Sequence, residues 1–168
     1  MSKVLIVGPS GSGKTFVSSA LRKRGINAVD ADSVVGLSGW FDGMGNKVNF
    51  PEDADKEFLD NHEFLWNLDF LRMYLDSQKE VFFFGLSGNV FDAISLFDRA
   101  YWLNVEPAVL RENLRHETRK NPMGKTEYQL NNVLKFAKDV QQKAKRLGLR
   151  VLNVTNKSAE EIFELINS

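Results

Sequence analysis

The segment Gly8-Pro-Ser-Gly-Ser-Gly-Lys-Thr15 constrains the fold of this chain more than any other feature. It matches the pattern GxxxxGK[ST] in full, and it lies between a buried-type apolar run, Val4–Val7, and a helical pattern, Lys14–Arg24. Glycines let successive backbone N–H groups turn inward, and the following helix points its positive end at the same place. The segment therefore predicts a loop that binds the phosphates of a nucleoside triphosphate, with Lys14 at the β- and γ-phosphates and Thr15 on Mg²⁺. The residues expected to hold the phosphates are Gly8, Pro9, Ser10, Gly11, Ser12, Gly13, Lys14 and Thr15.

Short β-branched or aromatic runs alternate with helical patterns along the rest of the chain. The expected strands are Lys3–Val7, Ile26–Val29, Lys79–Phe84, Arg99–Val105 and Leu149–Val154, and Ser158–Glu161 forms a capping box that opens the last helix. Such alternation is typical of an α/β protein, with helices on both faces of a parallel sheet.

Two segments interrupt this alternation. Residues 33–78 begin with a glycine-rich stretch that predicts a hairpin turn at Gly43–Asn46, followed by a helical stretch, roughly Asp55–Ser77. Arg119–Lys125 is a polar loop with Pro and Gly between two helical patterns. The first segment is interpreted as an acceptor-binding insertion and the second as a lid, although both patterns also suit ordinary surface loops.

Composition excludes several classes of protein. The 168 residues suffice for one domain, and 22 basic residues balance 22 acidic ones, which argues against nucleic acid as a partner. The absence of cysteine excludes disulfides and thiolate metal sites and fits a cytoplasmic protein. No apolar run is long enough for a membrane span, and the two histidines offer no convincing metal site or catalytic triad.

The order of these features resembles the small P-loop kinases, the group that contains adenylate, shikimate and gluconate kinases. Within that group the chain is most similar to a set of uncharacterised bacterial small-kinase-like ATP-binding proteins, through Trp40–Trp66, Gly85–Asn89, Phe97-Asp98 and Asn121–Lys125. The resemblance implies a single P-loop NTPase domain over residues 1–168. Its fold would be a three-layer α/β/α sandwich with five parallel strands in the order 2-3-1-4-5, an acceptor-binding insertion at about 33–78 and a short lid at about 115–126. It also implies ATP and Mg²⁺ as cofactors.

Two carboxylates follow the second expected strand, where the carboxyl edge of a parallel sheet faces the ligand. The resemblance implies that Asp30 holds a magnesium-bound water and that Asp32 binds the acceptor, orienting or deprotonating its hydroxyl. Either residue could instead simply cap a short turn.

The usual Walker B aspartate is missing after the third expected strand, which ends in Gly85-Leu-Ser-Gly-Asn89. Here Gly85 would let the chain pass close to the phosphates, and Ser87 and Asn89 are candidate contacts of the acceptor or of metal-bound water. The alternative is a tight turn that caps the next helix.

Arginines recur every four residues at Arg111, Arg115 and Arg119, a spacing that places them on one helical face. Arg115 and Arg119, nearest the expected lid, are predicted to stabilise the transferring phosphate, unless the helix is merely a solvated charged one. Asn156 and Lys157 lie where the relatives hold the adenine ring.

The charges divide between two regions. Residues 28–80 contain 12 acidic and 4 basic side chains, whereas residues 111–150 contain 11 basic and 4 acidic ones. Anionic acceptors need cations, usually arginines, and no arginine occurs from Gly25 to Leu71. We therefore expect a neutral or cationic small-molecule acceptor, with Trp40 and Trp66 either lining its pocket or packing in the core. An arginine from elsewhere in the fold, such as Arg22, Arg24, Arg72 or Arg99, would weaken this argument.

The leading hypothesis is thus a small-molecule kinase that acts as a monomer or homodimer. Its rivals are a nucleoside monophosphate kinase of the same fold, an ATP-binding regulatory module without such activity, and a nucleic-acid end kinase. Net neutrality and the acidic insertion argue against the last of these.

Overall fold

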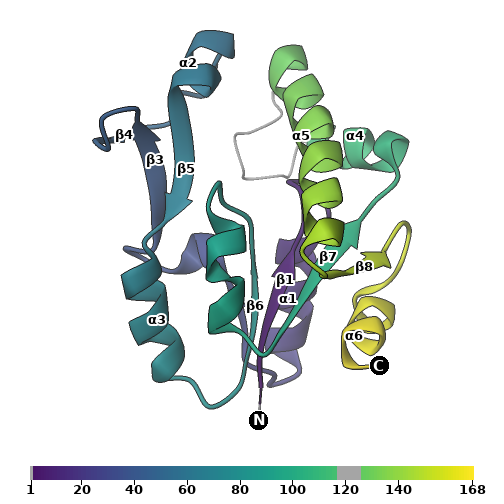
Figure 1. Ribbon diagram of the computed structural model, residues 1–168. Helices are drawn as coiled ribbons and strands as arrows, with labels where there is room; N and C mark the ends of the chain where they lie inside the picture. Colours follow the sequence, from purple (N-terminus) through teal and green to yellow (C-terminus); the bar gives the residue numbers. More distant parts are fainter. Residues whose placement is uncertain (1, 117–125) are drawn as a thin grey trace.

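A five-stranded parallel sheet forms the centre of the computed structural model, which describes residues 2–116 and 126–168 (Figure 1). Its strands lie in the order β2-β6-β1-β7-β8. Their bounds are β1 Lys3–Val7, β2 Ala28–Asp30, β6 Val81–Gly85, β7 Arg99–Asn104 and β8 Arg150–Asn153. Without the strands of the insertion, this is the predicted order 2-3-1-4-5, so the predicted α/β fold is confirmed.

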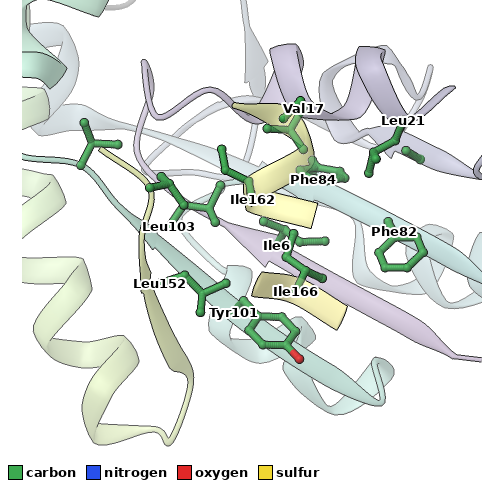
Figure 2. Close-up of a cluster of buried hydrophobic side chains, with 14 of the residues drawn as sticks. Ile6, Val17, Leu21, Phe82, Phe84, Tyr101, Leu103, Leu152, Ile162 and Ile166 are labelled. Atoms are coloured by element: carbon green, nitrogen blue, oxygen red, sulfur yellow. The ribbon is translucent and has the colours of Figure 1, made fainter. Parts of the chain in front are cut away.

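The two faces of the sheet carry separate apolar clusters, because successive side chains of a buried strand point to opposite sides. Val4 and Ile6 of β1 belong to one cluster, and Leu5 and Val7 belong to the other. Figure 2 shows the first cluster, in which Ile6 packs among residues of the neighbouring strands and helices. The strands that carry the site are therefore fixed from both sides.

Helices cover both faces. The first cluster includes residues of α1 (Lys14–Lys23), α4 (Pro107–Arg115), α5 (Glu127–Arg146) and α6 (Ala159–Asn167). The second includes residues of α3 (Leu68–Asp76), of the 3-10 helix η2 (Val90–Leu96) and of the far end of α5. The predicted capping box is present, since Ser158 and Glu161 bond each other's backbone N–H groups at the start of α6.

The insertion forms a second, antiparallel sheet in the order β4-β3-β5. The predicted hairpin is confirmed: β3 (Ser38–Asp42) and β4 (Lys47–Val48) pair across the turn. The predicted continuous helix over Asp55–Ser77 is wrong. Instead, a short helix α2 (Lys56–Asn61) is followed by β5 (His62–Trp66), and only then by α3.

Pairing with a distant strand explains this difference. β5 aligns along the whole of β3, from Ser38 opposite Trp66 to Asp42 opposite His62. The aromatic residues of this stretch suit a half-buried strand as well as a helix, and the available edge of β3 decides between the two. Asn67 then caps α3 by accepting from the Phe70 N–H, which restarts the helix after the strand.

Among the described residues, no helix combines the length and the apolar character that crossing a membrane requires.

The close packing at the end of β6 yields a stability prediction. A Cβ on Gly85 would lie 2.6 Å from the Ala31 Cβ and 2.6 Å from Cζ2 of Trp66, both in the buried second cluster. We expect Gly85→Ala to lower the free energy of unfolding by about 1–3 kcal/mol through overpacking, measured by denaturant unfolding. Gly43→Ala is the matched control, because no atom lies within 4 Å of its Cβ position. Equal stability of the two variants would contradict the prediction.

Candidate nucleotide and acceptor site

The phosphate loop joins β1 to α1 and has the backbone that the motif requires. Gly11 and Gly13 adopt φ angles of 83° and 93°, in the left-handed region that glycine tolerates best. Gly13 is the N-cap of α1, and no side chain caps this helix. α1 thus directs the positive end of its dipole into the loop, as in phosphate sites at helix N-termini.

The loop is closely packed on its inner side. A Cβ on Gly8 would lie 2.6 Å from Oγ of Ser12, so a larger residue would obstruct the cradle. Lys14 lies across the loop, with Nζ donating to the carbonyl oxygens of Gly8 and of Pro9, the latter at 2.8 Å. Within the described residues, the buried Ser12 hydroxyl has no hydrogen-bond partner. Glycine backbone, lysine and hydroxyl groups in this arrangement fit the phosphates of a nucleotide.

Thr15 and Asp30 connect the phosphate loop to the second strand. The Thr15 hydroxyl donates to Oδ2 of Asp30 at 2.6 Å, while Oδ1 of Asp30 accepts from the Asp32 N–H at 3.0 Å. Asp30 is therefore also the cap of the 3-10 helix η1 (Ala31–Ser33). This agrees with the alternative interpretation of the sequence, in which the residue caps a short turn. The cap leaves the other carboxylate oxygen directed at Thr15, so the two roles are compatible.

These two side chains also suit a magnesium ion. Magnesium takes hard oxygen ligands and is usually bound by one or two protein side chains together with substrate phosphates and water. Thr15 and Asp30 present such oxygens 2.6 Å apart, although no group of three or more acidic or histidine residues in the described part of the chain could hold a metal. The chain itself thus fits a nucleotide-bound Mg²⁺ rather than a metal held by protein alone.

Asp32 lies in the same turn and has an altered acidity. Partial desolvation by the surrounding protein raises the pKa of Asp32, the negative charge of Asp30 adds to this rise, and Lys14 opposes it. Asp32 nevertheless belongs to the solvent-exposed residues of the chain. A carboxylate with a raised pKa beside the phosphate loop is better able to accept a proton than an ordinary aspartate.

The segment after β6 ties the insertion to the central sheet. The Asn89 side chain accepts from the Trp66 N–H and donates to the Trp66 carbonyl, both at 2.9 Å. Ser87 is buried and donates to Asn89 Oδ1 at 2.9 Å, and the Gly88 N–H donates to the Phe64 carbonyl at 2.6 Å. Ser87 and Asn89 thus have structural partners here, and their predicted contacts with an acceptor stay predictions.

The two tryptophans of the insertion occupy different environments. Trp66 is 3% exposed and packs against Gly85 and Ala31, while its indole N–H has no partner among the described residues. Trp40 is only half-buried and stacks on Phe50 at a ring-centre distance of 4.8 Å. Trp66 is therefore a core residue in this structure, whereas Trp40 remains a candidate for contact with an acceptor.

The arginine helix is shorter than predicted. α4 ends at Arg115, with His116 in an extended conformation, and Arg119 lies outside the described residues. Arg111 and Arg115 do share a face, and both contact Glu127 at the start of α5, at 3.2 and 2.8 Å. These arginines contribute to the pKa of Glu127 being lower than that of an ordinary glutamate, through the hydrogen bond from Arg115 above all.

Sequence reasoning missed three residues that connect these parts. The Asn113 side chain donates to the Gly11 carbonyl at 3.0 Å, which ties α4 to the phosphate loop. Glu127 holds the two arginines, and Gln129 is a fully buried residue of α5. No local pattern identifies these contacts, because each joins residues far apart in the sequence.

The last candidates lie after β8. Asn156 has a φ angle of 55°, unusual for a residue other than glycine, and both Asn156 and Lys157 are exposed. The Thr155 hydroxyl accepts from the Glu106 N–H at 3.0 Å, which fixes this turn beside the start of α4. The structure thus places an exposed turn at the carboxyl end of the sheet, and its predicted contact with a base stays a prediction.

The fold and the loop define a P-loop protein of the α/β class. The sequence matches the family described as an AAA domain over residues 4–135, and the chain belongs to this family. A search among curated proteins found no match.

Solved structures with the same fold include sugar-acid and shikimate kinases. A shikimate kinase from Acinetobacter baumannii, in complex with shikimate, superposes with a TM-score of 0.62 at 15% identity, over 99% of this chain and 93% of that one. A shikimate kinase from Bacteroides thetaiotaomicron gives 0.58 at 17%, over 99% and 98%. A gluconokinase from Sinorhizobium meliloti 1021 gives 0.54 at 18%, over 98% and 88%. The resemblance to small P-loop kinases is thereby confirmed for the fold.

The raised pKa of Asp32 leads to a prediction about stability. The folded protein binds a proton at Asp32 more tightly than the unfolded chain does. At pH values above the pKa that Asp32 has in the unfolded chain, the ionised side chain therefore destabilises the fold. We expect Asp32→Asn to raise Tm at neutral pH, and this gain to diminish as the pH falls through the folded pKa. Asp53→Asn, at an exposed turn residue, is the control. A gain that is independent of pH would contradict this origin.

Proposed function

We propose that this chain is an ATP- and Mg²⁺-dependent phosphotransferase, which moves the γ-phosphate to a hydroxyl of a small neutral or cationic molecule such as a nucleoside, sugar or polyol. The observation that carries the proposal is the chain of contacts from the phosphate loop through Thr15 and Asp30 to Asp32. It aligns a nucleotide cradle, a pair of metal-type oxygens and a proton acceptor. Cytoplasmic location and a monomeric or homodimeric state remain predictions.

The proposed reaction assigns a role to each of these groups. The N–H groups of the loop and Lys14 would bind the β- and γ-phosphates, and Arg115 would stabilise the charge that develops during transfer. Asp32 would orient the acceptor hydroxyl and take its proton as the new O–P bond forms and the bond to the β-phosphate oxygen breaks, with ADP as leaving group. Bound Mg²⁺, held through Thr15 and through water on Asp30, would neutralise phosphate charge.

The charges of the insertion support a neutral or cationic acceptor. Asp55, Glu57 and Asp60 are exposed on and beside α2. Of the arginines elsewhere, Arg22 donates to the Ala28 carbonyl at 3.2 Å and Arg24 lies over the Phe163 ring at 5.7 Å.

Arg99 is likewise engaged within the fold, where it donates to the Tyr101 hydroxyl at 3.3 Å and to the Ile166 carbonyl at 3.4 Å. These contacts occupy three of the arginines that would otherwise supply an anion site. Arg72, which is exposed on α3, is therefore the one to test.

The test is Mg²⁺-dependent ADP release from ATP against a pooled library of nucleosides, nucleotides, sugars, aminoglycosides and small acids. We expect ADP release that depends on a neutral or cationic acceptor. The rate should fall by several orders of magnitude in Lys14→Ala, because the groups that contact the phosphates act as a unit and the loss of one disables the rest. Lys23→Ala, at the end of the same helix, should leave the rate unchanged.

Other outcomes separate the rivals. Rapid phosphorylation of AMP or CMP that is lost in Arg72→Ala would indicate a nucleoside monophosphate kinase and contradict the charge argument. ATP binding without turnover of any acceptor would instead favour the regulatory module.

A further inference from the structure

The first turn of α5 holds the acceptor insertion through one buried side chain. Gln129 is 0% exposed, and its Nε2 donates to the Glu52 carbonyl at 3.1 Å and to the Ala54 carbonyl at 2.9 Å. Ala54 is itself buried, immediately before Asp55, which caps α2. Buried amide groups need such partners, so the contact fixes the approach to α2 against α5.

The same turn of α5 holds the arginines of α4. Glu127 accepts from Arg115 at 2.8 Å and from Arg111 at 3.2 Å. Residues two positions apart on a helix point about 200° apart, so Glu127 and Gln129 face opposite sides of α5. The turn therefore stands between the arginine helix on one side and the acceptor insertion on the other.

We propose that Gln129 is a positioning residue that couples the acceptor insertion to the nucleotide site through the first turn of α5. This inference rests on the proposed function in that a nucleotide occupies the phosphate loop and Arg115 contacts its γ-phosphate. A bound γ-phosphate would compete with Glu127 for the Arg115 guanidinium. Binding of the nucleotide would therefore weaken the contact that holds Arg115 to the first turn of α5. Gln129 carries that change to residues 52–54, and by linkage the insertion acts back on the nucleotide with equal free energy.

The experiment is hydrogen–deuterium exchange on the full chain, with and without Mg²⁺ and the β,γ-imido analogue of ATP. In the unmodified protein, the analogue should slow exchange at residues 8–15 and also change exchange at residues 54–59. Gln129→Met keeps the shape of the side chain but removes its donor. In this variant we expect faster exchange at 54–59 without nucleotide, no further change on adding it, and, at a saturating concentration of the analogue, undiminished protection at 8–15.

Controls on the same helix and network sharpen this test. Gln142→Ala changes an exposed glutamine of α5 and should behave like the unmodified protein. Glu127→Gln weakens the hold on Arg115 and should raise affinity for the analogue by about two- to fivefold, as expected for a surface ion pair. That effect on affinity, unlike simple loosening of the fold, requires competition for the guanidinium.

The outcomes that overturn the proposal are distinct. If the response at 54–59 survives in Gln129→Met, or is absent from the unmodified protein although 8–15 is protected, Gln129 does not couple the two regions and the proposed function is unaffected. If the analogue protects nothing at 8–15, the proposed function fails and this inference fails with it.

Discussion

Parallel pairing of β1 with β6 on one side and with β7 on the other is the constraint on which the rest of the structure depends. Both faces of β1 are covered, so its residues cannot be displaced without opening one of the two apolar clusters. Because the strands run in the same direction, their carboxyl ends meet at one edge. The phosphate loop, Asp30 and Gly85 therefore come together although they are far apart in the sequence.

The features predictable from sequence were those that short-range patterns determine. The phosphate loop, the hairpin at Gly43–Asn46 and the capping box at Ser158 each depend on neighbouring residues, and all three are present. The buried strands were equally predictable, because short continuous apolar runs bounded by polar turns are typical of strands that are buried on both faces. The strand order came from family resemblance, since spacing alone does not determine which edges pair.

The features that could not be predicted depend on distant partners. β5 is a strand because β3 offers an edge, and Trp66 is buried because Gly85 leaves room for its ring. Asp30 contacts Thr15 with one carboxylate oxygen and the Asp32 N–H with the other, so capping the turn does not prevent it from acting as a site residue. Gln129 gave no signal at all, because an amide on an amphipathic helix is ordinarily a solvent-exposed residue.

The charged groups of the candidate site contribute little to the stability of the fold. Desolvation by the surrounding protein and the neighbouring carboxylate both raise the pKa of Asp32, while the ion pairs of Arg111 and Arg115 with Glu127 are exposed and individually weak. Neither arrangement is what packing alone would select. Both become reasonable if the carboxylate must accept a proton and the guanidinium must exchange Glu127 for phosphate. A strong, buried ion pair at that position would have held Arg115 away from the nucleotide.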